Sequence, residues 1–519
     1  MRFVSDPPIS VKIRKMQERV RWQDPLIAER DIDQTRLVLG GDRTSDDPEF
    51  SFLVIGDSGA GPQGGHNPQR RVAKHMLDHL DSSRFVLHTG DVMYLVGSSE
   101  YYHKNFIDPY RELIVGGEHP KRIDYDKMVF NLPFLPVPGN HDYYDLPFIY
   151  GLVAQTTLPL RRLLQSKLDI DIGWHGSDKG KAYAKAFLDY LKGFDDEGDL
   201  QRHLDRHYSA KINGDRALHY EPGKFTRLPN RYYTFRSGGI DFFALDSNTF
   251  NAPVPLPKTK EGQDFRRQLE ERRERLDNEK LSYVEQCASL DPNKPEESEL
   301  LDDLRTKIEQ LDELRNDIDK QLSADETTVT DTEQLNWLKE KLIESWHTDD
   351  VRGRVVYFHH PPYVTEATKW HQAQTLAIRD RFRAVLNAVS NTIGSLRADR
   401  PVVDLVLNGH AHCLEYLRTA NTGHADAHTN WIVCGGSGFS LRRQRTEGAE
   451  LKETEDGKVI ARSLLYVGRN GQGSQKRRPY SFLRIDVRGD KVPKFLIRPF
   501  ITERFQGKWS NSALEPFEI

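Results

Sequence analysis

Three apolar runs between positions 52 and 142 each end in a glycine that is followed by an acidic or amide residue. They read FLVIGDSGAG, VLHTGDVMY and FLPVPGNHDYYD. An apolar, β-branched run that ends at a glycine is typical of a buried strand followed by a tight turn. In a sheet with parallel strands, such turns meet beyond the carboxyl ends of the strands, where ligands bind. The pattern therefore predicts a polar site at one edge of an α/β sheet.

Helical patterns separate these runs, and the same alternation returns later in the chain. Residues 67–83 read NPQRRVAKHMLDHLDSS, with apolar residues three and four positions apart on one face. Residues 231–248 predict a β-hairpin around Gly238 and Gly239. After residue 333, two helical patterns alternate with the runs GRVVYFHHPPY and VVDLVLNGHAH, and the chain ends in a β-rich region. This alternation predicts mixed sheets with helices on their outer faces.

The changes of pattern along the chain suggest how it is divided. Residues 1–48 are polar and contain prolines, so we expect an N-terminal arm. Residues 49–257 and 326–519 carry the alternation of strands and helices, and we expect them to form one catalytic domain. Within this domain, residues 146–230 lose the rhythm. They predict an insertion that forms either a rim over the site or decorative packing.

Residues 258–325 show the clearest change in composition, because nearly every residue is charged or a good helix former. Apolar residues recur at three- and four-residue spacing along two stretches, which Pro292 and Pro295 separate. This predicts an antiparallel, coiled-coil-like helical hairpin that projects from the domain. Two roles stay open: a solvated spacer, or an arm for a homodimer or another partner, since a sparse apolar seam favours contact with a further helix.

Composition and charge exclude several classes of protein. The formal net charge is -4 and the sequence pI is about 6.6, so no basic surface for nucleic acid or an anionic membrane is indicated. The three cysteines are scattered, which argues against a disulfide framework and a cysteine-rich zinc site. The N-terminal stretch has no apolar region of a secretory signal, and no run of about 18 apolar residues could span a bilayer. We therefore expect a cytoplasmic protein.

Five strand-end loops together predict a metal centre. Their candidate ligand residues, in chain order, are Asp57, Asp91 with Tyr94, Asn140 with His141, His359 with His360, and His410 with His412. Carboxylate, amide, phenol and imidazole donors suit iron, zinc or manganese better than calcium. About seven protein ligands are too many for one ion with an open position, and they suit two ions that share a carboxylate. Two such ions stabilise the attacking and leaving oxygens of a displacement at phosphorus.

The series GDSG, GDVMY, GNHD, FHHPPY and GHAH resembles the calcineurin-like metallophosphoesterase superfamily, and most nearly its purple acid phosphatase group. Two features point to that group. Gly59 stands where the commoner superfamily pattern has a histidine, and Tyr94 follows Asp91 by three residues. The resemblance covers residues 50–145, 230–250 and 333–440. It implies a four-layer αββα sandwich of two mixed sheets flanked by helices, here with a helical-hairpin insertion, in the α/β (α+β) class.

The resemblance also implies roles for the loop residues. One ion, Fe(III) in the family, would bind Asp57, Tyr94 and His412, and Asp91 would bridge both ions. The second ion, Fe(II), Zn(II) or Mn(II), would bind Asn140, His359 and His410. His141 would lie over the substrate phosphate, where it stabilises the transition state or protonates the leaving oxygen. His359 matches the family position better than His360, which remains the alternative.

The implied activity is hydrolysis of phosphomonoesters by metal-activated hydroxide, with Asp91 and His141 as the catalytic residues. The alternatives are a phosphodiesterase or nucleotide pyrophosphatase of the same superfamily, or a scaffold protein that acts through the hairpin. His66 and His371 are weaker candidates for contact with the substrate, and Asn248 for supporting the ligands from behind. The expected partners are a phosphoester substrate and, through residues 258–325, a second copy or another protein. We expect neither nucleic acid nor a membrane as a partner.

Overall fold

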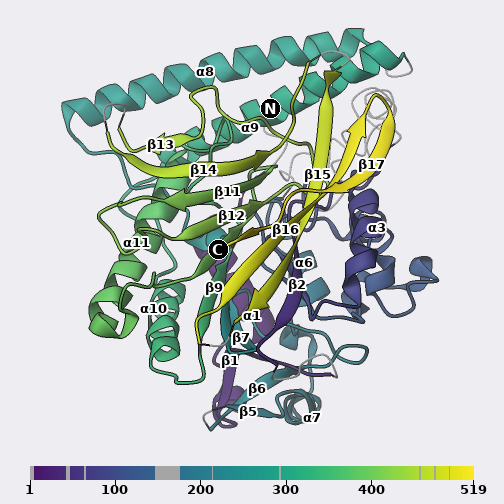
Figure 1. Cartoon of the computed structure of the whole chain (residues 1–519), viewed down its shortest axis with the longest axis vertical. Helices are drawn as coiled ribbons and strands as arrows, with labels where there is room; N and C mark the ends of the chain where they lie inside the picture. The colour runs from purple at the N-terminus through teal and green to yellow at the C-terminus, as the bar shows by residue number, and fades with distance from the viewer. Residues whose placement is uncertain are drawn as a thin grey trace.

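Two mixed β-sheets form the centre of the protein, and helices cover their outer faces (Figure 1). The computed structural model describes residues 5–41, 47–62, 66–145, 176–212, 214–291, 294–454, 457–472, 475–489 and 491–519. Apolar side chains of both sheets, among them Phe52, Phe242 and Ile485, share one buried core between the sheets. A second core fills the space between the larger sheet and its outer helices. This layering confirms the predicted α/β fold of two mixed sheets flanked by helices.

The larger sheet has eleven strands in the order β13-β14-β11-β12-β10-β9-β8-β7-β1-β6-β5. In chain order these are β1 (Ile32–Leu39), β5 (Ala210–Ile212), β6 (Asp215–Tyr220), β7 (Tyr233–Ser237), β8 (Ile240–Ala244), β9 (Gly353–Tyr357), β10 (Leu405–Asn408), β11 (Leu414–Thr419), β12 (Asn430–Cys434), β13 (Glu450–Lys452) and β14 (Val459–Val467). Strands β8, β9, β10 and β12 are parallel. Alternate residues of β9 face the two cores, with Val355 between the sheets and Val356 under the helices.

The smaller sheet has seven strands and supplies the other half of the inter-sheet core. Its strands are β2 (Phe50–Ile55), β3 (Val86–His88), β4 (Phe134–Pro136), β15 (Arg477–Arg488), β16 (Lys494–Phe505), β17 (Lys508–Ala513) and β18 (Phe517–Glu518). Strands β2, β3 and β4 are parallel neighbours, as the three apolar runs predict. Their carboxyl ends therefore lie along one edge of the sheet.

Helices pack on the outer faces of both sheets. The α-helices outside the hairpin are α1 (Ile9–Val20), α2 (Pro25–Ala28), α3 (Pro68–Leu80), α6 (Lys181–Phe187), α7 (Glu197–His207), α10 (Thr332–Trp346) and α11 (Ala373–Ile393). The short helices are η1 (Ser99–Tyr101), η2 (His103–Ile107), η3 (Arg111–Leu113), η4 (Pro120–Arg122), η5 (Tyr125–Lys127), η6 (Leu191–Gly193), η7 (Ser247–Thr249) and η8 (Gly394–Arg397). Helix α3 packs on β15 and β16, and α10 and α11 cover the larger sheet. Within the described residues, none of these helices has the length and apolar character to cross a membrane.

The charged segment forms the predicted hairpin, but it does not project. Helices α8 (Lys260–Ser289) and α9 (Pro295–Ser323) are antiparallel and joined by ion pairs. Helix α8 is the outer one, and α9 lies against the body of the protein (Figure 1). The Asp317 carboxylate of α9 accepts hydrogen bonds from the backbone N–H groups of Ala373 (2.8 Å) and Gln374 (3.0 Å) at the start of α11. The expectation of a projecting hairpin is therefore wrong, because polar side chains of α9 dock it on the domain.

Two stretches of the sequence join the larger sheet unexpectedly. Strand β1, within the expected N-terminal arm, lies between β6 and β7 and pairs in parallel with both. Strands β5 and β6 come from the expected insertion and extend the sheet beyond β1. Residues 146–175 of that expected insertion lie outside the described residues.

A buried charge cluster fixes the loop that follows β8. The Arg231 guanidinium, 1% exposed, lies 3.3 Å from Asp246 and 2.6 Å from Asp331, and Asp246 accepts from the backbone N–H of Asn248. Removing one partner of a buried ion pair leaves an uncompensated buried charge, which costs about 3–5 kcal/mol. We therefore expect Arg231→Met to lower the free energy of unfolding by about that amount.

The loss is measured as a lower urea midpoint, followed by circular dichroism. Arg202→Met provides the control, because the ion pair of Arg202 with Asp199 is exposed, with side-chain exposures of 73% and 58%. Equal midpoints for the two variants would contradict a structural role of the buried cluster.

Candidate metal centre

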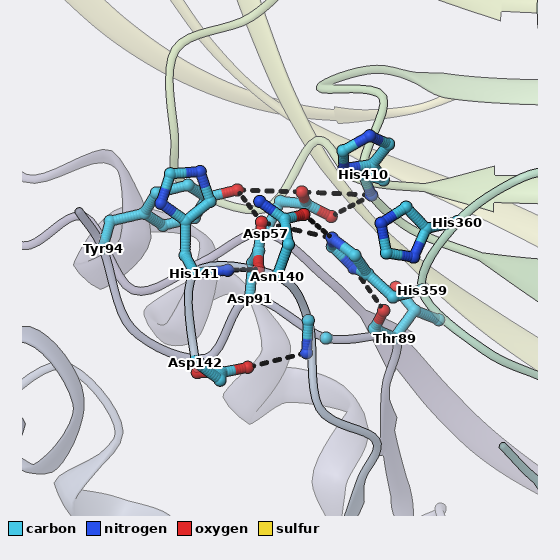
Figure 2. Close-up of polar contacts among 12 residues, drawn as sticks. Asp57, Thr89, Asp91, Tyr94, Asn140, His141, Asp142, His359, His360 and His410 are labelled. Carbon is cyan, nitrogen blue, oxygen red and sulfur yellow. Dashed lines mark hydrogen bonds and ion pairs between the residues drawn. The ribbon is translucent and has the colours of Figure 1, made fainter. Parts of the chain in front are cut away.

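Loops from both sheets converge at one edge of the inter-sheet core, and Figure 2 shows the side chains that they bring together. Asp57 follows β2, Asp91 follows β3 and Asn140 follows β4 in the smaller sheet. His359 follows β9, and His410 with His412 follow β10 in the larger sheet. All six side chains are at most 6% exposed. The parallel strands thus place ligands that are distant in the sequence at a common point.

Three of these residues adopt a left-handed backbone conformation. The φ angles are 52° at Asp57, 53° at Asp91 and 66° at His410. Residues other than glycine rarely adopt positive φ, and such strained residues cluster at functional sites. The sharp turn directly after each strand directs these side chains back into the space between the loops.

Tyr94 lies at the middle of one group of donors. Its hydroxyl oxygen is 2.9 Å from Oδ1 of Asp57, 2.8 Å from Oδ2 of Asp91 and 3.2 Å from Nε2 of His412. The ring of Phe439 stacks on that of Tyr94 with centroids 3.8 Å apart, which fixes the phenol in place. Four potential ligand atoms therefore meet around the Tyr94 hydroxyl.

A second group of donors meets at the same oxygen of Asp91, Oδ2. Nε2 of His359 lies 3.2 Å from Oδ2 of Asp91 and 3.0 Å from Oδ1 of Asn140. Ligand atoms of Asp91, His359 and His410 lie within 4.8 Å of one another. Asp91 is therefore shared by both groups, as a bridging carboxylate would be.

Two histidines are oriented in the way that metal ligands require. Nδ1–H of His359 donates to the carbonyl oxygen of Thr89 (2.9 Å), and Nδ1–H of His412 donates to that of Ser440 (2.9 Å). Each hydrogen bond leaves Nε2 of the ring directed at the carboxylates. Metal-binding histidines almost always bind a carbonyl or carboxylate through the other ring nitrogen. The donor set and its orientation therefore fit bound metal ions.

Two glycines allow the loops to approach one another closely. A Cβ atom at Gly59 would lie 1.9 Å from the carbonyl oxygen of Val92, so no side chain fits where the commoner superfamily pattern has a histidine. A Cβ atom at Gly139 would lie 2.1 Å from both the backbone nitrogen and Oδ1 of Asp91. The absence of side chains at these positions lets the turn after β3 pack against its neighbours on both sides.

Burial and the charges of neighbouring groups shift the pKa values of the candidate ligands. Burial raises the pKa of Asp57 to about 7, although His359 opposes this shift. Burial lowers the pKa of His359, but the Asp91 carboxylate outweighs it and raises that pKa to about 9. Burial opposes ionisation of Asp91, yet His359 and His141 hold its pKa below the ordinary value. Metal ions that bind here would therefore have to displace protons from Asp57 and His359.

His141 lies beside the two donor groups. Its backbone N–H donates to Oδ1 of Asp91 (2.8 Å), and its Nδ1–H donates to the carbonyl oxygen of Leu95. The ring packs against Tyr94, with centroids 4.3 Å apart. With Nδ1 engaged, Nε2 is the ring nitrogen that can reach a substrate.

The remaining candidates lie at different distances from the centre. His360 turns away, with Nδ1 2.8 Å from Oγ of Ser247. Asn248 donates from Nδ2 to the carbonyl oxygen of Pro138 (2.9 Å), two residues before the ligand Asn140, and so supports that loop. His371 is exposed. His66 is half-buried ahead of α3.

Sequence reasoning missed several residues that border the site. The Asp142 carboxylate accepts hydrogen bonds from the backbone N–H groups of Val92 (3.2 Å), Met93 (3.1 Å) and Gly139 (2.8 Å), and so ties the second loop to the third. The position of Asp142 directly after the motif Gly-Asn-His could have indicated that it ties these loops together. Lys369, Arg442 and Glu313 also lie against the centre, and no local motif marks any of them.

Comparisons with known proteins do not assign a family. No family model matches the sequence, and no curated protein matches it. Among solved structures, "GAP50 the anchor in the inner membrane complex of Plasmodium" is similar with a TM-score of 0.35 and 11% identity, over 90% of this chain and 88% of that one. Purple acid phosphatase PPD1 from yellow lupin (Lupinus luteus) seeds gives 0.38 and 12%, over 91% and 54%. PhoD gives 0.39 and 12%, over 92% and 70%. Similarities this low add nothing to what the geometry of the centre supports.

Binding of metal ions should stabilise the fold in a pH-dependent way. An ion at 100 times its Kd contributes about 2.7 kcal/mol of stability, which raises the Tm. The rise in Tm on adding Mn²⁺ or Zn²⁺ should be larger at pH 8 than at pH 6, because Asp57 and His359 must lose protons to bind. Thermal unfolding with and without each ion at both pH values measures this.

Asp91→Asn should abolish the metal-induced rise in Tm, because it removes the shared carboxylate. Asp404→Asn is the matched control, since its carboxylate binds the backbone N–H of Arg354 instead of lining the centre. An unchanged rise in Asp91→Asn would place the metal site elsewhere.

Proposed function

We propose that the protein hydrolyses phosphate esters at a centre of two metal ions, with phosphomonoesters as the preferred substrates. The observation that carries this proposal is the Asp91 carboxylate, which lies between two groups of ligand atoms. Two ions that share a carboxylate suit displacement at phosphorus. Asp57, Tyr94 and His412 would hold one ion, and Asn140, His359 and His410 the other.

When bound, the two ions would activate the attacking water and neutralise charge on the phosphate oxygens. The protein holds the ligand carboxylates in a buried setting, where electrostatic interactions are stronger than in water. Asp142 keeps the turns after β3 and β4 at a fixed separation through their backbone N–H groups. This rigidity would keep groups that bind to the two turns in a fixed relative position.

His141 is suited to act on the substrate rather than on a metal ion. The hydrogen bond from Nδ1–H to the carbonyl oxygen of Leu95 engages Nδ1 and leaves Nε2 as the ring nitrogen for the substrate. Nε2 can then donate a proton to the leaving oxygen or a hydrogen bond to the phosphate. General acid catalysis of this kind contributes about 10²–10⁴ to a rate.

A panel of substrates tests the proposal directly. The protein, loaded with Mn²⁺, Zn²⁺ or iron, should release phosphate from p-nitrophenyl phosphate faster than p-nitrophenol from bis-p-nitrophenyl phosphate. The opposite preference would favour the alternative of a phosphodiesterase.

Asp91→Asn should lose activity by at least about 10³-fold, because both ions lose a ligand.

The exposed Asp199→Asn is the control for loss of a carboxylate and should keep full activity. Absence of hydrolysis by the wild-type protein with every ion and substrate would reject the enzyme and leave the scaffold interpretation. In that case size-exclusion measurements on a variant that lacks residues 258–325 would show whether the hairpin binds a second copy.

Tyr94 provides a spectroscopic test of the proposed Fe(III) ligand. Burial and the Asp57 and Asp91 carboxylates raise the pKa of the Tyr94 phenol, so a strongly polarising ion is needed to form the phenolate. Iron-loaded protein should therefore absorb visible light through phenolate-to-iron charge transfer, and Tyr94→Phe should lose this band. A colourless, active protein with stoichiometric manganese or zinc would refute iron but not the phosphoesterase.

A further inference from the structure

Helix α9 of the hairpin lies against the segments that follow two candidate ligands. Oγ1 of Thr306 is 2.9 Å from Oγ of Ser440, whose carbonyl oxygen accepts from the His412 ring. Further along α9, Asp317 binds the backbone N–H groups at the start of α11. The helix is thus attached at two places, and Glu313 lies between them in the sequence.

Glu313 is held by two buried cations. Its Oε2 lies 2.6 Å from Nζ of Lys369, and its Oε1 lies 3.0 Å from Nη2 of Arg442. Lys369 and Arg442 are each 1% exposed, whereas Glu313 is 19% exposed. Burial opposes its ionisation, but the two cations lower the pKa of Glu313 to about 2, so it is a carboxylate at neutral pH.

Both cations adjoin the candidate metal ligands. Nζ of Lys369 is 3.1 Å from Nε2 of His410, and the backbone N–H of Arg442 donates to the carbonyl oxygen of His412 (2.9 Å). One residue, Lys369 or Arg442, therefore separates Glu313 from the two candidate histidines that follow β10. The position of Glu313 brings an anion to the edge of a site that the proposed function assigns to a phosphate.

The place of this ion pair, beside His410 and His412, suggests a role besides docking of the hairpin. Taking a lysine and an arginine out of water is costly unless anions compensate them. Glu313 contacts both cations, and Glu309 is a second, more distant partner of Arg442 at 3.5 Å. Arg442 keeps a further buried donor, since its Nε has no hydrogen-bond acceptor among the described residues. Lysine and arginine are also the side chains that bind phosphate groups in proteins. A carboxylate between them, beside a phosphoesterase centre, takes the place that a phosphate would fill.

We propose that Lys369 and Arg442 form an anion site for a second phosphate group of the substrate, and that Glu313 occupies this site in the closed hairpin. Its relevance to catalysis rests on the proposed function, since the metal ions would hold the reacting phosphate next to it. The substrate class is then a phosphomonoester that carries a second phosphate group close to the first, and inorganic pyrophosphate is the simplest probe with two neighbouring phosphates. Binding displaces Glu313 from the two cations, and α9 shifts away from the centre.

Binding of inorganic pyrophosphate to the metal-free full-length protein tests this inference. Isothermal titration calorimetry in the presence of a chelator measures the site without any contribution from bound ions or from hydrolysis. Glu313→Gln should bind pyrophosphate at least about tenfold more tightly than the wild-type protein, because the competing carboxylate is gone. Adding Arg442→Gln or Lys369→Gln to Glu313→Gln should reverse the gain.

Asp312→Asn is the matched control, because Asp312 is the adjacent acidic residue of α9 and pairs with Lys280 of α8. It should leave the affinity for pyrophosphate unchanged. Equal affinities of Glu313→Gln and the wild-type protein would overturn the inference, and so would a gain of the same size in Asp312→Asn.

The two double variants are independent, so the test remains decisive if one of them does not fold. Circular dichroism identifies the folded variant, and retention of the full gain in that variant would also overturn the inference. The outcome is separate from that of the proposed function. Tight, Arg442-dependent binding without any hydrolysis would support the anion site and reject the phosphoesterase. Hydrolysis without such binding would support the phosphoesterase and reject the anion site.

Discussion

The buried carboxylate of Asp91 is the interaction on which the surrounding structure depends. An ionised carboxylate without exposure to water requires compensating donors. Asp91 receives them from His359, from the Tyr94 hydroxyl and from the backbone N–H of His141. These donors come from strands of two different sheets. The face-to-face packing of the sheets therefore both forms the core and brings the donors within reach of one carboxylate.

Most of the strands that carry the site could be predicted from the sequence, because the strand and its loop are one continuous pattern. In β9 and β10, apolar runs pass directly into the candidate histidines. Strand β1 was missed because its pairing with β6 joins residues about 180 positions apart and follows no local alternation. The docking of α9 was missed for a similar reason, since the groups that hold it lie in loops far along the chain.

The placement of the histidines follows from strand geometry. Side chains of a strand alternate between its faces, so His359 continues the side of Tyr357, which faces the other sheet. His360 continues the side of Phe358, which faces the outer helices. The structure places His359 against Asp91 accordingly, while its role as a ligand stays a prediction. Asp142 and Arg442 act on backbone groups or on distant side chains, and such contacts leave no spacing pattern in a sequence.

The hairpin can cover the centre because its insertion leaves the sheets intact. It leaves the domain after β8 and returns before α10, and its two ends lie close together, with Lys258 2.7 Å from Glu326. Polar contacts then help to hold α9 on the body, among them those of Thr306, Glu313 and Asp317. Polar contacts between charged groups exchange partners more readily than an apolar interface, because an anion in solution can replace the carboxylate. A helix that Glu313 helps to hold is therefore able to respond to the anions that the centre attracts.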